Sequence, residues 1–177
     1  MKPPERIETE RFFLRVPSMD DAPDIFTAYA QDSEVTRYLT WLPHKNVEET
    51  YQIVERILKL WKAGDVYSYA IAPKDSDTVI GMIAMHPDGL RIGLGYVLAR
   101  AHWGKGYVTE VARAIIDWAF QQPSIYRVYA TTDVENIAAR HVLEKVGMQC
   151  EGTLRKYIVH PNISGVPRDS YMYAIVK

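Results

Sequence analysis

The sequence lacks the features that mark secreted, membrane-spanning or nucleic-acid-binding proteins. It contains one cysteine, Cys150, so an internal disulfide is impossible and a reducing compartment is expected. No apolar run approaches the roughly 20 residues that a membrane-spanning helix needs, and the polar start MKPPERIETE is not a signal peptide. The formal net charge is only −1, which argues against a nucleic-acid or anionic-membrane surface. We therefore expect a cytoplasmic protein with neither of these partners.

Metal ligands and repeats are also absent from the sequence pattern. His102, His141 and His160 lie far apart in the chain, and no His/Cys cluster has metal-ligand spacing, so no metal site is predicted. There is no internal repeat, low-complexity segment or linker. The chain has 177 residues, of which 47% are hydrophobic, and this suits one core of ordinary size. We expect a single domain over residues 1–177.

The stretch that carries most chemical information is residues 95–111, GYVLARAHWGKGYVTEV. An apolar strand ends near Leu98, a turn with Gly104 and Gly106 follows, and apolar residues then recur at helical spacing. Glycine permits a positive φ, and the first amide groups of a helix have no internal partner, so this junction favours an anion such as a diphosphate. The Walker and Rossmann glycine patterns are both absent. Taken alone, GKG is a weak signal, and a plain tight turn with a solvated Lys105 is the favoured interpretation.

Hydrophobic periodicity predicts strands and helices along the whole chain. The predicted strands are residues 9–16, 66–72, 79–86, 90–98, 125–131, 148–159 and 168–176. The predicted helices begin at Ser18, near Ser33, at Asn46, after Gly106 and at Asn136. The strands from 66 to 98 form an antiparallel meander joined by short turns. The strand at 125–131 must run parallel to the one at 90–98, because a helix crossover separates them.

Two motifs together resemble one known family. From Asn136 the chain reads NIAARHVLEKVGMQCEGTLR, and with GKGYVTE it resembles the GNAT superfamily of acetyl-CoA-dependent N-acetyltransferases. The opening IETERFFLRVPSMDDAPDIF and the closing GVPRDSYMYAIVK resemble the branch of ribosomal-protein N-terminal acetyltransferases (RimJ/RimL-type). The resemblance spans nearly the whole chain. It implies an α/β (mixed α+β) fold of three layers, α/β/α, around a mixed, mostly antiparallel sheet of about seven strands with two splayed parallel strands.

The resemblance also implies a co-substrate and its site. Acetyl-CoA would lie between the splayed strands, with no metal involved. The pantetheine and thioester contacts fall on Val97, Leu98 and Ala99, and a backbone N–H near Leu98 is the candidate that stabilises the oxyanion. Asn136 would reach the pantetheine or a water on the amine, or would simply cap its helix. The diphosphate contacts fall on Trp103, Gly104, Lys105, Gly106, Tyr107 and Val108.

The catalytic and acceptor residues are predicted with alternatives. Glu110, Glu135 and Asn136 are the candidate catalytic residues, and both carboxylates also stand near helix starts, where an electrostatic capping role is the default. Further base candidates are Asp133 and, as outsiders, Tyr96, His141 and His160. In relatives the segment between the first helices contributes to the acceptor side. The predicted substrate contacts are therefore Tyr38, Trp41 and His44, for which aromatic packing under a loop is the alternative.

Three positions depart from the family pattern. Ala101 stands where many members carry Gln or Arg, Leu143 where many carry a tyrosine general acid, and Ala139 where this branch often has serine. A thiol with a pKa of about 8.5 leaves without a dedicated acid, so catalysis is not excluded. A peptide α-amine, with a pKa of about 7.7–8.0 against about 10.4 for lysine, is easier to deprotonate by roughly 3 kcal/mol.

These considerations favour an N-acetyltransferase that acts by direct transfer on a protein or peptide N-terminal α-amine. A small-molecule amine as the acceptor is the close alternative. A non-catalytic acyl-CoA-binding module and a nucleotide-binding α/β domain of other chemistry are the rival classes. A monomer or a homodimer is expected, and the sequence does not identify the acceptor.

Overall fold

One twisted sheet of eight strands organises the computed structural model, which describes residues 2–177. The strand order is β1-β2-β3-β4-β5-β6-β8-β7, and β5 with β6 is the parallel pair in an otherwise antiparallel sheet. The strands are β1 (Arg6–Glu8), β2 (Phe12–Arg15), β3 (Tyr67–Pro73), β4 (Gly81–Asp88), β5 (Arg91–Leu98), β6 (Arg127–Asp133), β7 (Gln149–Ile158) and β8 (Arg168–Val176). The predicted mixed α/β fold with one parallel pair is confirmed, with eight strands in place of about seven.

The start of the chain differs from the prediction of one strand over residues 9–16. Two antiparallel strands, β1 and β2, form there instead, with Ile7 opposite Leu14. Residues 9–11 make the turn between them: the Thr9 amide donates to the Phe12 carbonyl at 2.9 Å, and the Phe12 amide donates to Thr9 Oγ1 at 3.1 Å. A short hydroxyl side chain that bonds to nearby backbone favours a turn over an extended strand, so residues 9–11 were wrongly predicted as strand.

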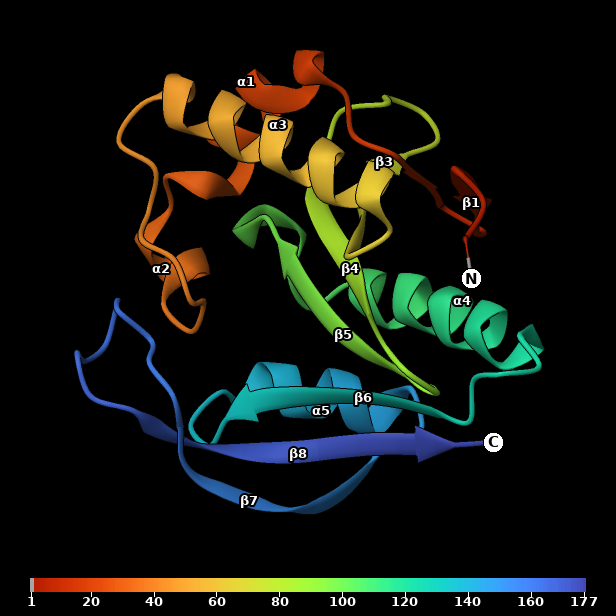
Figure 1. Cartoon of the computed structure of the whole chain (residues 1–177). Coiled ribbons are helices and arrows are strands. Elements are labelled where there is room, and N and C mark those ends of the chain that lie inside the picture. Colours follow the sequence, from red (N-terminus) through yellow and green to blue (C-terminus); the bar gives the residue numbers. More distant parts are fainter. Residues whose placement is uncertain (1) are drawn as a thin grey trace.

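Helices cover both faces of the sheet (Figure 1), with α1 and α3 on one side and α4 and α5 on the other. The α-helices are α1 (Ala22–Ile25), α2 (Ser33–Thr36), α3 (Val47–Ala63), α4 (Tyr107–Gln121) and α5 (Ile137–Lys145). Shorter turns are η1 (Met19–Asp21) and η3 (Arg100–His102), both 3₁₀, and the π-type turn η2 (Phe26–Ala30). Within the described chain, none of these helices combines the length and hydrophobicity needed to cross a bilayer.

Local sequence sets the helix ends. Asn46 caps α3 by accepting the Glu49 amide at 3.0 Å, and Gly64 ends it in the left-handed conformation at φ +82°. The predicted pairing of Ser18 with Asp21 is present, since the Ser18 amide donates to the Asp21 carboxylate at 2.7 Å. These helix ends, which were predicted from a short polar side chain or a glycine, are therefore confirmed.

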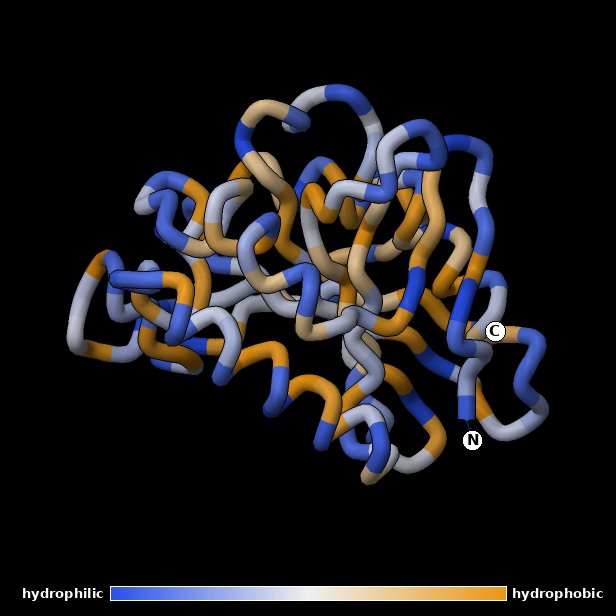
Figure 2. The backbone as a smooth tube through the Cα atoms, turned by 90° about the horizontal axis from the view of Figure 1, so that it is seen from above, coloured by the Kyte–Doolittle hydropathy of each residue, from blue (hydrophilic) through white to orange (hydrophobic). Residues whose placement is uncertain are grey.

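The sheet separates two hydrophobic clusters. The larger one joins β3 to β6 and β8 with α4 and α5, around fully buried Tyr69, Ile83 and Ile115. The smaller one lies under α1 and α3, around Ala70 and Val54. Figure 2 shows the matching alternation of hydrophobic and hydrophilic residues along the helices and strands. Burial on both faces fixes the register of the central strands, because a one-residue shift would expose their apolar side chains.

The parallel pair is short and then opens. β5 and β6 pair only at Arg91↔Arg127, Ile92↔Val128 and Gly93↔Tyr129. Beyond that point β5 continues to Leu98 and β6 to Asp133 without pairing to each other. The predicted splay is confirmed, and it leaves the facing edges of two central strands without sheet partners.

Candidate functional site

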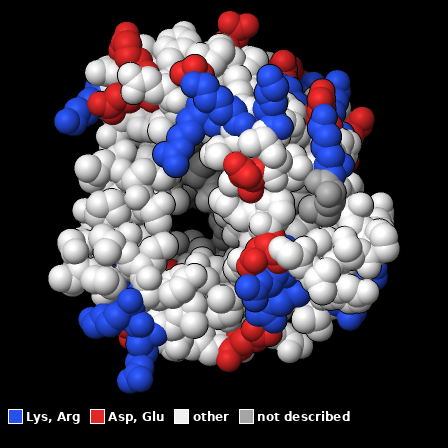
Figure 3. Space-filling view, in the orientation of Figure 1, with Lys and Arg blue, Asp and Glu red and all other residues white. Residues whose placement is uncertain are grey.

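A cleft of about 460 Å³ occupies the space where β5 and β6 diverge. Figure 3 shows a deep hollow near the centre of the molecule, at the place where Figure 1 shows the two strands separating beside α2. Residues from β5, the following turn, the first turn of α4, α5 and the α2 region line it. Among them are Tyr38, Tyr96, Val97, Leu98, Trp103, Gly104, Gly106, Tyr107, Val108, Thr109, Asn136, Ala139 and His141.

One end of the cleft is a cluster of backbone donors. Gly104 and Gly106 have φ of +73° and +74°, a region that favours glycine. The first bond within α4 runs from the Glu110 amide to the Gly106 carbonyl at 3.1 Å. The amides of residues 107–109 therefore precede the helical ladder, and Gly106 has no side chain to cap them. These donors, with the positive end of the helix dipole, fit a diphosphate.

The Trp103 side chain ties this turn to the end of β5. Its indole Nε1 donates to the Leu98 carbonyl at 2.7 Å. That carbonyl lies where β5 has no partner on its β6 side, so the bond satisfies a group that the splay would otherwise expose. The contact holds the glycine turn against the strand that forms the cleft wall.

Most of the predicted cofactor contacts line the cleft, and two do not. Ala99 is 4% exposed, and its amide donates to the Ile80 carbonyl at 2.8 Å on the α1 side of the sheet. Lys105 is exposed beside the cleft, and its carbonyl accepts a bond from Arg11 at 3.2 Å. The predicted cofactor residues that line the cleft are Val97, Leu98, Trp103, Gly104, Gly106, Tyr107, Val108 and Asn136.

Glu110 points away from the cleft and is fully engaged. One carboxylate oxygen accepts from Thr9 Oγ1 at 2.7 Å and from the Arg11 amide at 2.8 Å, and the other accepts from Arg11 Nε at 2.6 Å. Burial alone would raise the pKa of Glu110, but these hydrogen bonds and the Arg11 charge lower it overall. The contacts favour the stabilising role for Glu110, which holds the β1–β2 turn on the start of α4.

Glu135 and Asp133 belong to an ion-pair cluster at the end of β6. Arg168 donates to Asp133 at 2.6 Å and to Glu135 at 2.9 Å, and the Glu135 amide donates to Asp133 at 2.9 Å. Burial would raise the pKa of Asp133, but the bonds from Arg168 and Glu135 lower it. Glu135 does not line the cleft, and its side chain is 60% exposed. Arg168, which the sequence reading did not single out, thus fixes both carboxylates.

Asn136 lines the cleft and also caps α5. Its Oδ1 accepts the Ala139 amide at 3.1 Å, which satisfies one donor at the helix start. The side-chain nitrogen has no hydrogen-bond partner among residues 2–177. The capping role is present, and the contact to the cofactor or to a water stays a prediction.

The three predicted acceptor residues divide between the cleft and the surrounding core. Tyr38 lines the cleft. His44 bonds through Nδ1 to buried Thr50 at 2.8 Å, and the Trp41 ring packs on His44 with 5.2 Å between centroids. The Trp41 carbonyl accepts from Asn162, which links this loop to the segment before β8. Packing under a loop therefore accounts for Trp41 and His44, because the loop that carries them is hydrogen-bonded to the segment before β8.

Tyr96 of β5 brings a hydroxyl to the cleft lining. Its Oη donates to the Ala139 carbonyl of α5 across 3.4 Å, and burial raises its pKa. Leu143 is 1% exposed and packs in the main core, so it does not reach the cleft. The wall formed by α5 therefore offers no hydroxyl at residues 139 or 143, and the opposite wall offers Tyr96.

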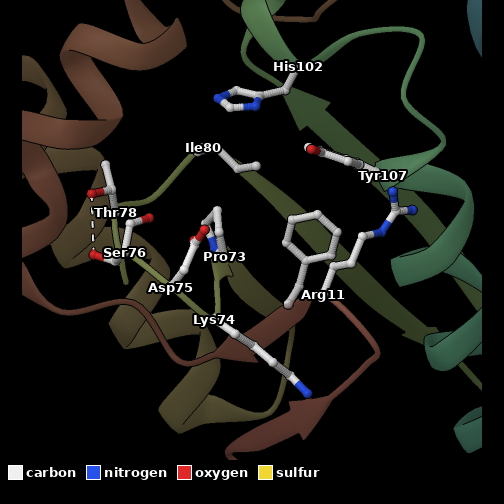
Figure 4. A pocket seen from close by; sticks show the side chains of 10 residues that line it. Arg11, Pro73, Lys74, Asp75, Ser76, Thr78, Ile80, His102 and Tyr107 are labelled. Carbon is white, nitrogen blue, oxygen red and sulfur yellow. Dashed lines mark hydrogen bonds between the residues drawn. The ribbon is translucent and has the colours of Figure 1, made fainter.

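A second pocket, of about 660 Å³, lies behind the glycine turn and shares Tyr107 and His102 with the cleft (Figure 4). Its cations are already paired. Arg11 bonds to Glu110, and Lys74, which extends away from the pocket centre in Figure 4, bonds to Glu8 at 2.6 Å. Burial, and then the charge of Lys105, lower the pKa of His102. In the described part of the chain, no group of three or more His, Cys, Asp or Glu side chains is placed to hold a metal ion.

Comparison with known proteins agrees with this geometry. The family model described as acetyltransferase (GNAT) domain matches residues 11–149. The Bacillus licheniformis protein named uncharacterized N-acetyltransferase p20 is 32% identical over 176 residues, covering 98% of this chain and 97% of the relative.

Two solved structures extend the comparison. A GNAT-family acetyltransferase from Bacillus anthracis superposes with a TM-score of 0.84 at 26% identity, over 97% of this chain and 98% of that one. The ribosomal L7/L12 α-N-protein acetyltransferase RimL, solved with coenzyme A, gives a TM-score of 0.85 at 20% identity, over 97% and 98% of the two chains. At that identity the second likeness shows the fold alone.

Proposed function

The chain belongs to the GNAT acetyltransferase family and is an acetyl-CoA-dependent N-acetyltransferase, and we propose that its acceptor is a protein or peptide N-terminal α-amine. The observation that carries the acetyl-transfer part of this function is the continuous cleft that joins the splayed strands to the uncapped start of α4. One domain over residues 1–177 would contain the whole site.

Different residues along this cleft would bind different parts of acetyl-CoA. The amides of residues 107–109 would bind the diphosphate, and the unpaired edge of β5 from Tyr96 to Leu98 would bond to the amide groups of the pantetheine arm. Acetyl-CoA supplies the activated acetyl group. Tyr96, whose raised pKa keeps its hydroxyl protonated at neutral pH, would turn its single hydroxyl hydrogen from the Ala139 carbonyl to the departing sulfur. This hydroxyl would replace the one that α5 lacks at Ala139 and Leu143.

Two arguments support an α-amine as the acceptor. A reacting amine must be neutral, and an α-amine reaches that form at a cost roughly 3 kcal/mol lower than a lysine side chain. RimL, whose fold this chain shares, is described as an α-N-protein acetyltransferase. With Glu110 and Glu135 both engaged in ion pairs, an acceptor that needs little help from a strong base fits the site better.

Release of CoA thiol, measured with a matched panel of acceptors, tests the proposal. The panel pairs each peptide that has a free α-amine with the same peptide blocked at its N-terminus and carrying one lysine, and it includes a polyamine. We expect turnover with free α-amines, and mass spectrometry should locate the acetyl group on the first residue. Turnover only with the polyamine would assign a small amine, and saturable acetyl-CoA binding without any thiol release would contradict an α-amine acceptor.

A further inference from the structure

His86 lies on β4 near the point where β5 and β6 separate, on the sheet face opposite α4 and α5. It is the β4 partner of Gly93 in β5, and Gly93 is in turn the partner of Tyr129 in β6. This is the last pair before β5 and β6 diverge. Residues directly opposite each other in neighbouring strands share one face, so the imidazole and the phenol flank the point where the strands separate.

Of the β5 glycines Gly93 and Gly95, the first is covered by His86 and Tyr129, whereas the second leaves room for one more atom beside the imidazole. A Cβ added at Gly93 would lie 3.2 Å from the Tyr129 ring and 3.4 Å from His86 Cβ. A Cβ added at Gly95 would lie 3.7 Å from His86 Nε2. The imidazole nitrogen is therefore beside the backbone of β5 at the position where the strand begins to line the open cleft. No β5 side chain separates the two.

The His86 imidazole is free to accept a proton. None of the side chains in residues 2–177 bonds to it, and the side chain is exposed. Although the residue is exposed on one side, the atoms that surround the ring on the other lower its pKa by desolvation, which favours the neutral form. The charged groups on the same face are paired with others: Arg91 with Asp88 at 2.6 Å, and Tyr129 with Asp88 at 3.4 Å.

Arg127 lies two residues before Tyr129 on β6. It is also paired, because it bonds to Glu151 on β7. None of these groups is a cause of the lowered His86 pKa, which arises from burial. The imidazole thus differs from Glu110 and Glu135, since each of those carboxylates is bound by an arginine.

We propose that the acceptor amine binds over Gly95, beside the His86 imidazole, and that His86 Nε2 takes the proton which the attacking nitrogen loses. This inference rests on the proposed function. The amine nitrogen forms the new bond to the acetyl carbon, and its proton passes to Nε2. The carbon–sulfur bond then breaks with its electron pair on sulfur. The thiolate gains a proton from water, and His86 returns its proton to water, so the charges balance.

Two variants and a matched control test this site. In His86→Gln, kcat/KM for the amine should fall about 100-fold, as expected when a general base is lost, with unchanged acetyl-CoA affinity by calorimetry. Added imidazole should restore part of the activity, and the ionisation below pH 6.5 should disappear from the pH profile. In Gly95→Ala, the added methyl should raise KM for the amine several-fold. Gly165→Ala, where an added Cβ meets nothing within 4 Å, should change neither constant.

The outcomes separate this inference from the proposed function. If the wild-type chain turns over α-amines and His86→Gln keeps its kcat/KM, or loses it without rescue by imidazole, the role of His86 is refuted while the function stands. Where the wild-type chain shows no turnover, NMR titration of the His86 ring with a peptide amine in the presence of CoA decides. A shift of the His86 signals that is absent in Gly95→Ala supports the acceptor site, and an unmoved signal refutes it.

Discussion

The two ends of the cleft are built in different ways. The end proposed to bind the diphosphate consists of backbone groups from one continuous segment, residues 103–109, which includes Gly104 and Gly106 at positive φ. The proposed acceptor end would draw on side chains from separate elements, with His86 on β4, Tyr129 beside it on β6 and Tyr38 next to α2. A motif of consecutive residues can specify the first end, whereas only the pairing of distant strands brings the second together.

The two ends should therefore tolerate different amino-acid substitutions. Backbone donors depend on the main-chain conformation, so most side chains in the turn can vary while the glycines cannot. A side-chain site depends on each residue separately and on the packing that orients it. The substitutions below test this contrast, beginning with the largest expected effect.

Gly106→Val should weaken acetyl-CoA binding 10- to 100-fold, while the fold stays intact. A β-branched residue at φ +74° costs about 1–3 kcal/mol, and an added Cβ meets no atom closer than 3.9 Å, so the penalty is conformational. Calorimetric titration with acetyl-CoA measures the loss, and Gly165→Val serves as the control. Unchanged affinity would break the claim that backbone shape forms the diphosphate end.

Glu110→Gln should lower the free energy of unfolding by about 2 kcal/mol at pH 7, because charge-assisted bonds to Arg11 are lost. The folded pKa of Glu110 is lowered, so its contribution is present above the unfolded value of 4.5 and disappears as the pH falls below it. Denaturant unfolding of both forms at pH 7 and pH 4 should show a difference that shrinks in acid. Equal stability combined with a loss of turnover would instead make Glu110 the base.

Tyr96→Phe should lower kcat about 3- to 10-fold, with little change in the affinity for acetyl-CoA. The loss corresponds to one hydrogen bond to the departing sulfur, and the ring that packs beside the cleft remains. Steady-state kinetics with a peptide acceptor gives kcat, and direct titration gives the affinity. If kcat is unchanged, the hydroxyl of Tyr96 serves only its bond to Ala139.

Asn136→Ala should cost about 1 kcal/mol of stability through the lost cap of α5. Asn136→Asp should retain the cap, since a carboxylate oxygen can accept the Ala139 amide. Comparing the two variants by thermal unfolding and by kcat isolates any part played by the side-chain nitrogen. If the aspartate form is as active as wild type, Asn136 acts as a cap alone, and the cleft loses one side-chain contribution.

Much of the fold follows from local sequence. Neighbouring residues predicted the β3–β5 meander, the caps at Asn46 and Asn136 and the turn at Gly106. The structure confirms these predictions. Thr9 shows where this reading fails, since a hydroxyl that bonds back to the Phe12 amide made a turn inside an apparent strand.

The candidate site divides in the same way. The turn with Gly104 and Gly106 could be proposed as an anion site because a glycine turn between a strand and a helix exposes amide donors wherever it occurs. His86 could not, because one histidine in a strand of apolar residues carries no signal until β4, β5 and β6 align it with Gly93 and Tyr129. Nor could the sequence reveal that Arg11 and Arg168, 99 and 33 residues away, occupy Glu110 and Glu135.

The sequence by itself determined the elements and the glycine turn before α4, since both arise from the conformational preferences of adjacent residues. The tertiary structure decided which titratable groups are free to react. Whether a carboxylate or an imidazole is paired depends on neighbours that only strand pairing and helix packing bring within a few ångströms.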